Sequence, residues 1–228
     1  MTRSLAWYAV VLCVGGTLGC SGKEADGDTT TTNGTRAATA PDTLTARIDA
    51  SRIQGSPTAP VWVVEISDFQ CPFCKTWHDS VYGTLRREFV TSGMIRLAYI
   101  NYPLPNHPNA GPAAEAAMCA GAQNKFWEMH DGLFETQNVW GPMPNAAAAF
   151  DSVARAKGVD VAAMRRCIES GATRALILAD AERAQESGVQ GTPTFIVGGD
   201  AILRGMQPIE AFREAIGRKL AARRGATQ

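Results

Sequence analysis

The sequence lacks a net charge and has few metal ligands. Its 22 lysine and arginine residues equal its 22 aspartate and glutamate residues, so it carries no field strong enough to recruit nucleic acid. It has only three histidines, and no second Cys-x-x-Cys or His-x-x-x-His accompanies the pair Cys71 and Cys74. A zinc site at these cysteines would need two more ligands at suitable spacing. We therefore expect no metal site, and no cofactor is predicted.

Large apolar residues are missing from residues 21–43, so this segment cannot bury a core and predicts a disordered linker. Before it, Arg3 and the apolar run 5–18 are typical of a secretory signal at residues 1–20, too short to span a membrane comfortably. The segment 17–20 resembles a bacterial lipobox, in which Cys20 would be lipidated. Thr17 replaces the usual leucine there, and an ordinary signal-peptidase site or an uncleaved anchor is the alternative.

The length and hydrophobic content of the chain are sufficient for one folded domain. The chain has 228 residues, 45% of them hydrophobic, which supports a single sizeable core and makes a second independent domain unexpected. Outside the signal there are four cysteines, an even number that suits an oxidising compartment, and we expect two pairs. The four are Cys71, Cys74, Cys119 and Cys167.

The chemistry is concentrated in the segment 68–75. An apolar, β-branched run at 61–67 predicts a buried strand directly before it, and Pro72 suits the first turn of a helix. Cys71 would then lie at a helix N-terminus, where free N–H groups and the helix dipole stabilise a thiolate. The pattern favours a redox-active Cys71–Cys74 pair. A zinc site and an inert bridge are the alternatives, although so short a loop stabilises little.

The rest of the chain predicts an α/β fold. An alternating stretch at 44–53 indicates an edge strand, and helical spacing of apolar residues predicts a helix from 72 to about 91. The strand expected at 95–100 would run parallel to 61–67. Ala-rich segments predict helices near 109–122, 125–137, 145–157, 160–170 and 172–187. The chain then returns to a hairpin around Gly198-Gly199 and a last amphipathic helix opened by Pro208.

Four segments in this order resemble the DsbA-like thiol:disulfide oxidoreductases of the thioredoxin fold: the segment 68–74, Tyr102-Pro103-Leu104, Lys125-Phe126-Trp127 and the segment 191–195. The resemblance covers about residues 45–222. It implies a thioredoxin-like domain at 44–224 with an all-helical insertion at about 105–187. It also implies that Thr192-Pro193 is a cis peptide beside the cysteines, with the Thr192 backbone available to substrate.

The resemblance also assigns roles to single residues. Glu65 occupies the position of a buried acid beneath the disulfide, where it could relay the proton of Cys74; a solvent-facing carboxylate is the alternative. Pro72 and Phe73, between the cysteines, would contact substrate. Strongly oxidising members carry histidine where this chain has Phe73, so one cationic stabiliser of the thiolate is missing. Cys119 and Cys167, absent from the simplest members, are expected to form a structural disulfide, with two buried thiols as the alternative.

These features predict an exported, periplasmic thiol:disulfide oxidoreductase that forms or exchanges disulfides in cysteine-containing exported proteins. A membrane quinone-linked thiol oxidase, or an electron donor, would recycle it. Contact with a membrane is expected only through an N-terminal lipid. A disulfide reductase or isomerase is one alternative. The other is a tethered module that binds unfolded chains without turnover.

Overall fold

The structure, a computed structural model, describes residues 43–225. The signal predicted at 1–20, with Cys20, and all but the last residue of the linker predicted at 21–43 lie outside the described residues. None of the helices within 43–225 is both long and apolar enough to cross a membrane. In chain order the elements are α1 (Leu44–Ser51), β1 (Ile53–Gln54), β2 (Val61–Ser67), α2 (Pro72–Trp77), η1 (His78–Tyr82), α3 (Gly83–Leu85), η2 (Arg86–Val90), β3 (Ile95–Asn101), α4 (Ala110–Gly121), α5 (Phe126–Glu135), α6 (Gln137–Trp140), α7 (Ala147–Ala156), α8 (Val161–Ser170), α9 (Arg174–Glu186), β4 (Thr194–Val197), β5 (Ala201–Arg204) and α10 (Ile209–Gly225).

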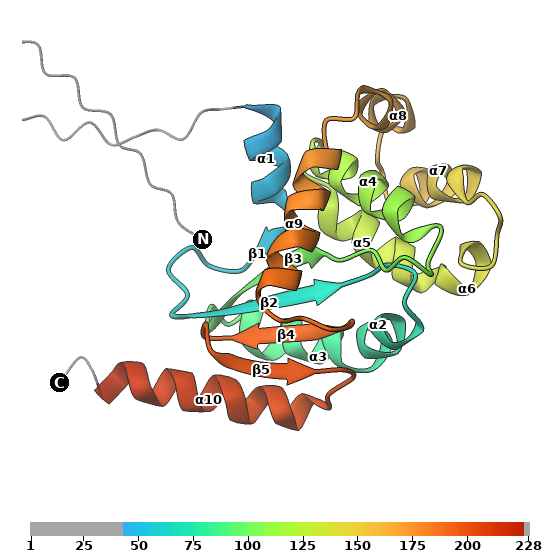
Figure 1. The fold of residues 1–228 in the computed structure, drawn as a ribbon. Coiled ribbons are helices and arrows are strands. Elements are labelled where there is room, and N and C mark those ends of the chain that lie inside the picture. The colour runs from blue at the N-terminus through green and yellow to red at the C-terminus, as the bar shows by residue number, and fades with distance from the viewer. Residues whose placement is uncertain (1–42, 226–228) are drawn as a thin grey trace, which may run out of the picture. The chain divides into compact units, whose positions relative to one another are not determined.

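The strands form one five-stranded sheet in the order β1-β3-β2-β4-β5 (Figure 1). β2 and β3 run parallel, with Val61 beside Ile95, and the helical segment from α2 to η2 connects them. The predicted β-α-β unit is therefore confirmed. β4 pairs antiparallel with β2 and with β5, and Gly198 and Gly199, both with positive φ, turn the predicted hairpin. The site-bearing strand β2 thus lies in the middle of the sheet.

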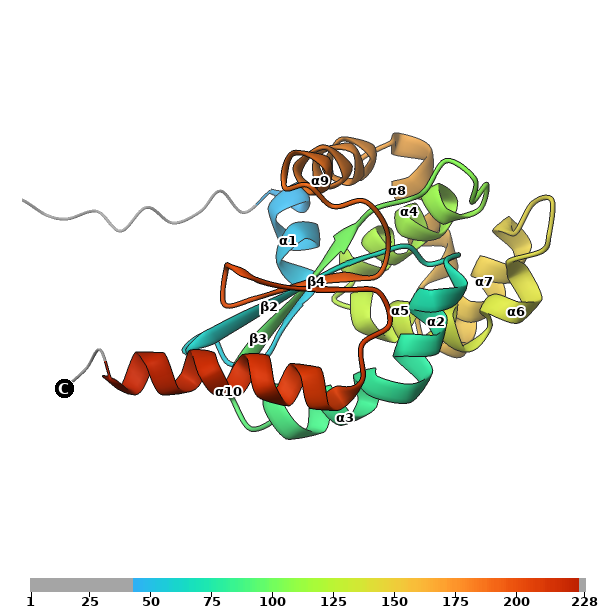
Figure 2. The same cartoon turned by 60° about the horizontal axis from the view of Figure 1, so that its bottom comes forward.

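Helices cover both faces of the sheet (Figure 2). On one face, α10 and the segment from α2 to η2 pack against alternate residues of the central strands. That core contains Val61, Val63, Trp77, Leu85, Ile95, Leu97, Phe195, Phe212 and Ile216. On the other face, α9 packs on the sheet through Ala184, with Val189 and the β2 residue Ile66. The alternation of β2 therefore sets which of its side chains lie beneath the cysteine-bearing helix.

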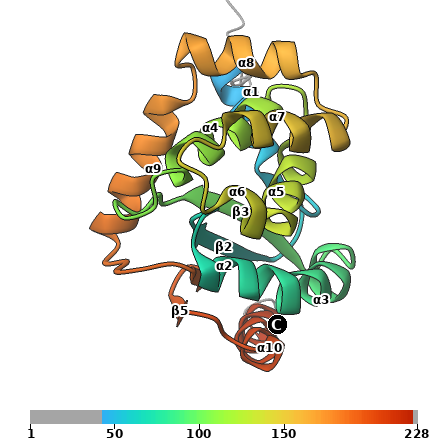
Figure 3. The ribbon, with the colours of Figure 1, turned by 90° about the vertical axis from the view of Figure 1, so that its right-hand side faces the viewer.

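Helices α4 to α8 form a second layer beyond the carboxyl end of β2, the end from which α2 begins (Figures 1 and 3). Their core consists of small residues of α4 and large aromatic residues of the following helices, among them Phe126, Phe134, Trp140 and Phe150. Each of the five predicted helices of the segment 109–187 is present, and the last of them, α9, packs on the sheet. The short helix α6 was not predicted.

The expected edge strand at 44–53 is wrong for most of its length. Residues 44–51 form α1, and only Ile53 and Gln54 make a strand, which pairs antiparallel with β3. The Thr43 hydroxyl accepts a hydrogen bond from the Ala46 N–H at 3.1 Å and so caps the helix. Leu44 and Ile48, four residues apart, fall on one helical face, and Ile48 is fully buried. Capping and this spacing outweigh the short alternation that suggested a strand.

The helical segment that begins directly after Cys71 runs without a break from Pro72 to Val90, close to the predicted range of 72 to about 91, but it is not uniform. Regular α turns in α2 and α3 alternate with the wider π turns η1 and η2. Four of its buried residues, Trp77, Val81, Leu85 and Phe89, recur every four positions, and Tyr82 and Val90 beside them are buried too. This stripe holds the segment against the sheet.

Candidate active site

The end of β2 delivers the cysteines to the start of α2. Cys71 is the N-cap residue of α2, with extended backbone angles of φ −68° and ψ 124°, and Pro72 takes the first helical position. The Cys71 carbonyl accepts the Lys75 N–H at 3.1 Å, which closes the first turn. Free N–H groups of this turn therefore point toward the Cys71 sulfur, the arrangement that favours a thiolate.

Both thiols are free in the structure and buried, and only Cys71 keeps some exposure to solvent. Cys74 is fully buried, whereas Cys71 is 3% exposed. The Cys71 Sγ lies 3.5 Å from the carbonyl oxygen of Thr192, in the loop before β4. The Thr192–Pro193 peptide bond is cis. The turn is held by a bond of 2.8 Å from the Thr194 hydroxyl to the Gly191 carbonyl. The segments 71–74 and 191–194, far apart in sequence, thus form one site.

The two thiols have different pKa values because their surroundings differ. The pKa of Cys71 is lowered to about 6, chiefly because the Cys74 thiol donates to its sulfur, and then because of Thr192 and the backbone N–H groups of Cys74 and Phe73. Burial opposes this shift. The pKa of Cys74 is raised well above its ordinary range by its own burial and by the neighbouring Cys71. Near neutral pH the reduced site therefore holds a Cys71 thiolate beside a Cys74 thiol.

Glu65 lies inside the protein rather than facing solvent. It stands between Tyr99 of β3 and Phe195 of β4 in the sheet register, and it is fully buried. Neither carboxyl oxygen has a hydrogen-bond partner within the described chain. Burial raises the pKa of Glu65 to about 8, and the charge of Asp131 adds to the shift. The pKa of Tyr99 is raised well above its ordinary range by burial and then by the charges of Glu65 and Cys74.

Two glutamines that sequence reasoning missed hold the backbone around Cys71. The buried Gln137 of α6 donates from Nε2 to the carbonyls of Phe69, at 2.7 Å, and Cys71, at 3.0 Å. Gln70 donates to the Gly141 carbonyl at 2.9 Å and accepts the Asn109 N–H at 2.6 Å. Both bridge the insertion to the active-site loop. No local pattern marks Gln137, because its partners lie more than 60 residues away in sequence.

Asp68 fixes the same loop from the other side. Its carboxylate is buried and accepts the Gln70 N–H at 2.7 Å through one oxygen. The other oxygen accepts the Leu104 N–H at 2.9 Å and faces His107 Nδ1 at 2.7 Å. Asp68 therefore ties the turn before Cys71 to the loop after β3. Its place directly before the cysteine motif was the one available signal.

The remaining predicted site residues divide between the surface and the insertion. Pro72 is exposed and Phe73 is 62% exposed, so the ring of Phe73 projects beside the cysteines. Cys119 of α4 and Cys167 of α8 form a disulfide across a sequence separation of 48 residues. The structure therefore brings Cys71, Cys74, Thr192 and Pro193 together, buries Glu65 in the central strand β2, and places Cys119–Cys167 apart.

A dithiol at a helix start, a cis-proline loop and a central β-α-β unit define a thiol–disulfide exchange site on a thioredoxin fold. A family model described as thioredoxin matches residues 48–218. Over 149 residues the chain is 30% identical to a probable disulfide bond formation protein D of Bacillus anthracis, covering 64% of this chain and 69% of that protein. This chain belongs to the DsbA-like thiol:disulfide oxidoreductases and is an enzyme of that class.

Solved structures support the same fold. Oxidised BdbD of Bacillus subtilis superposes with a TM-score of 0.67 at 21% identity, covering 75% of this chain and 92% of that one. DsbA of Chlamydia trachomatis gives a TM-score of 0.65 at 18% identity, covering 73% and 90%. The predicted fold class, a thioredoxin-like α/β domain with helices inserted, is confirmed. DsbA-like proteins act on substrates that contain cysteine.

Proposed function

We propose that this protein is an exported oxidant that introduces disulfides into other exported proteins. The observation that carries the proposal is the lowered pKa of Cys71, to about 6 from a usual thiol value of 9. At pH 7 the lower pKa stabilises the dithiol form by roughly 1 kcal/mol, or about 20 mV for this two-electron couple. A stabilised dithiol makes the disulfide form a better electron acceptor.

The reaction starts from the Cys71–Cys74 disulfide. A substrate thiolate attacks Cys71 Sγ, a mixed disulfide forms, and Cys74 leaves as a thiolate. Its raised pKa means that this thiolate takes up a proton near neutral pH. Glu65, with a pKa of about 8, is mostly protonated there and is our candidate donor. Attack on Cys71 is favoured because Cys74 is fully buried.

The second step releases the product. A second substrate thiolate attacks the substrate sulfur of the mixed disulfide, the substrate disulfide forms, and Cys71 leaves as a thiolate. Two electrons and the protons of two substrate thiols have then left the substrate. Because the pKa of Cys71 is about 6, this thiolate is a good leaving group at neutral pH.

Substrate is held, in this proposal, by the surface around Cys71. The Thr192 backbone beside the Cys71 sulfur offers main-chain hydrogen bonds to an extended segment, as in strand addition. Pro193 sets the course of that loop, and the exposed Pro72 and Phe73 supply apolar contact on the other side. These contacts are independent of substrate sequence, which suits an enzyme with many substrates.

Export and recycling complete the proposal. Residues 1–20 would direct export to the periplasm, Cys20 would carry a lipid, and 21–43 would tether the domain at 44–224. A membrane quinone-linked thiol oxidase would return the dithiol to the disulfide. Mass spectrometry of the mature protein tests the anchor: an N-terminal diacylated Cys20 is expected, and cleavage elsewhere without lipid would contradict it.

The reduction potential of the Cys71–Cys74 couple in glutathione buffers tests the direction of exchange. We expect a potential less negative than that of thioredoxin, which is about −270 mV. A value at or below the thioredoxin potential would favour the alternative, a reductase or isomerase kept reduced by an electron donor. A chain that binds unfolded polypeptide but oxidises no dithiol peptide would be a binding module instead.

A further inference from the structure

Two of the chain's three histidines are far apart in sequence but lie close together in space, outside the thiol site. His78 begins η1, one helical turn after Cys74, and His130 lies in α5 of the insertion. Asp131 follows His130, and one atom from each of these three side chains lies within 4.8 Å of the other two. The exchange mechanism uses none of the three as a ligand or nucleophile.

We propose that His78, His130 and Asp131 bind a first-row divalent transition-metal ion such as Zn²⁺. Two imidazole nitrogens and one carboxylate oxygen are a ligand set suited to Zn²⁺, Ni²⁺ or Cu²⁺ rather than to Mg²⁺ or Ca²⁺. Three protein ligands with an open position are also the usual number in accessible zinc sites. The ion would join η1 of the thioredoxin part to α5 of the insertion.

The spacing of the ligand atoms fits such an ion. Bonds of about 2.0–2.2 Å at tetrahedral angles separate neighbouring ligand atoms by about 3.3–3.6 Å. His78 Nε2 lies 3.5 Å from Asp131 Oδ1, within that range, and His130 Nδ1 lies 2.8 Å from the same oxygen. Binding would widen the second distance by about half an ångström. Without metal, the same atoms can share protons as hydrogen bonds.

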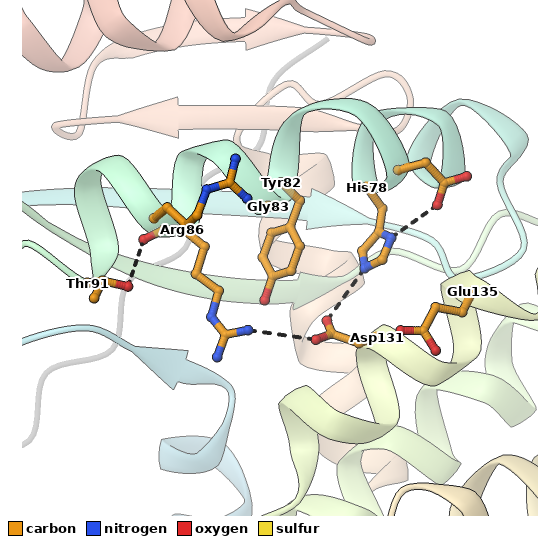
Figure 4. Close-up of a pocket in the computed structure, with 9 residues that line it drawn as sticks. His78, Tyr82, Gly83, Arg86, Thr91, Asp131 and Glu135 are labelled. Carbon is orange, nitrogen blue, oxygen red and sulfur yellow. Dashed lines mark hydrogen bonds and ion pairs between the residues drawn. The ribbon is translucent and has the colours of Figure 1, made fainter.

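The cluster is supported on one side and open on the other. The side chain of His130 is fully buried, whereas those of His78 and Asp131 are 10% and 23% exposed. A cavity of about 570 Å³ reaches the cluster, and His78 and Asp131 both line it (Figure 4). An ion can therefore enter from solvent and keep a water or substrate oxygen in its fourth position. Carboxylates of Asp79 and Glu135 line the same cavity.

Two arginines, Arg86 and Arg87, line the same cavity, and the charge of Arg86 opposes the binding of a cation at Asp131. Arg86 Nη1 lies 3.9 Å from Asp131 Oδ2, and its side chain is 51% exposed (Figure 4). Such a long, half-exposed side chain can turn into solvent, so its charge lowers affinity without closing the site. We therefore expect opposite effects from substitutions in the cluster. Loss of a ligand should weaken metal binding, and loss of the Arg86 charge should strengthen it.

Calorimetric titration with ZnCl₂ tests the site. The full chain is used without a polyhistidine tag, in the oxidised state and with remaining thiols alkylated, so that no thiolate competes. We expect one equivalent to bind, with affinity at least about 100-fold weaker in His78→Gln and in Asp131→Asn. Arg86→Gln should bind several-fold more tightly. His107→Gln is the matched control, because His107 is the one histidine outside the cluster.

A second measurement does not depend on heat signals. At 100 times its dissociation constant, Zn²⁺ should raise the unfolding midpoint of the wild type by roughly 5–10 °C and leave that of folded Asp131→Asn unchanged. X-ray absorption should show two imidazoles on the metal. Absence of binding up to millimolar Zn²⁺, or unchanged binding in both ligand variants, would overturn the proposal. Loss of binding only in His107→Gln would overturn it as well.

Discussion

Cys71 and Cys74 are separated by two residues at a helix start, whereas Cys119 and Cys167 lie 48 residues apart on two helices of the insertion. The first pair is present as thiols beside the Thr192 carbonyl, and the second as a disulfide. A short loop restrains the unfolded chain little, and a long one restrains it more. The first pair can therefore open at little cost in stability, and the second contributes to stability as long as it stays closed. Placement rather than residue type separates exchange chemistry from a structural cross-link.

The largest effect is expected from removing the nucleophile of the first pair. Cys71→Ser should lower the rate of dithiol-peptide oxidation by at least about 10³-fold, because no mixed disulfide can form. The double variant Cys119→Ala, Cys167→Ala should oxidise the same peptide within about twofold of the wild-type rate. If that double variant stays folded but loses oxidation activity, the second pair takes part in electron transfer and the contrast between the pairs disappears.

A smaller effect separates the two thiols of the active pair. At pH 7 the reduced enzyme should be alkylated at Cys71 at least about 100-fold faster than at Cys74, because only Cys71 is mostly thiolate. The Cys71 rate should fall on acidification with a midpoint near pH 6. Site-resolved mass spectrometry over a pH series measures both. Similar rates at the two sulfurs would show that the helix start does not distinguish them.

Removing the second pair, Cys119 and Cys167, should lower the stability of the fold. Cys119→Ala with Cys167→Ala should lower the free energy of unfolding by about 2–4 kcal/mol, the typical contribution of a disulfide that closes a long loop. Urea unfolding measures the loss, with Cys74→Ala as the control for thiol removal in the active pair. Mild reduction should open Cys71–Cys74 first. A double variant as stable as wild type would show that the cross-link has no structural role.

The smallest effect concerns the buried acid Glu65 of β2. The folded pKa of Glu65, about 8, lies above its ordinary value of 4.5, so the folded state retains a proton that the unfolded state releases. Wild type should therefore lose stability as pH rises from 5 to 7, by about 2 kcal/mol from this group, and Glu65→Gln should lack this loss. Oxidation by the variant should slow several-fold. Identical pH profiles of stability would contradict the buried, protonated carboxyl.

Local patterns were sufficient for most of the fold. The β-branched run of β2, the proline after Cys71 and the apolar spacing of the helices each act over a few residues, and each predicted its element. At 44–53 the pattern misled, because a short alternation competes with the cap from Thr43 and with the burial of Ile48. Alternation alone does not identify the structure of so short a segment.

The site was only partly predictable for a related reason. The cysteine motif is local, whereas Gln137 reaches the Cys71 carbonyl across 66 residues, and His78 faces Asp131 across 53. Such contacts depend on how the insertion packs against the sheet. Single-sequence reasoning sees His130 only as part of an aromatic helix face, and nothing in that face indicates that His78 lies opposite. Tertiary packing determines what these residues contact.

The alternation of α and π turns between Pro72 and Val90 affects how the cysteine-bearing helix is held. In a uniform α-helix, residues four apart drift around the axis by about 40° at each step, so Trp77 and Phe89 would lie about 120° apart. The wider turns of η1 and η2 reverse part of that drift. Trp77, Val81, Leu85 and Phe89 therefore stay closer to one face of the segment, the face that packs against the sheet. Contacts spread along one face restrict rotation of the helix about its own axis. The Cys71 sulfur at the start of the helix therefore keeps its orientation toward the Thr192 loop during exchange.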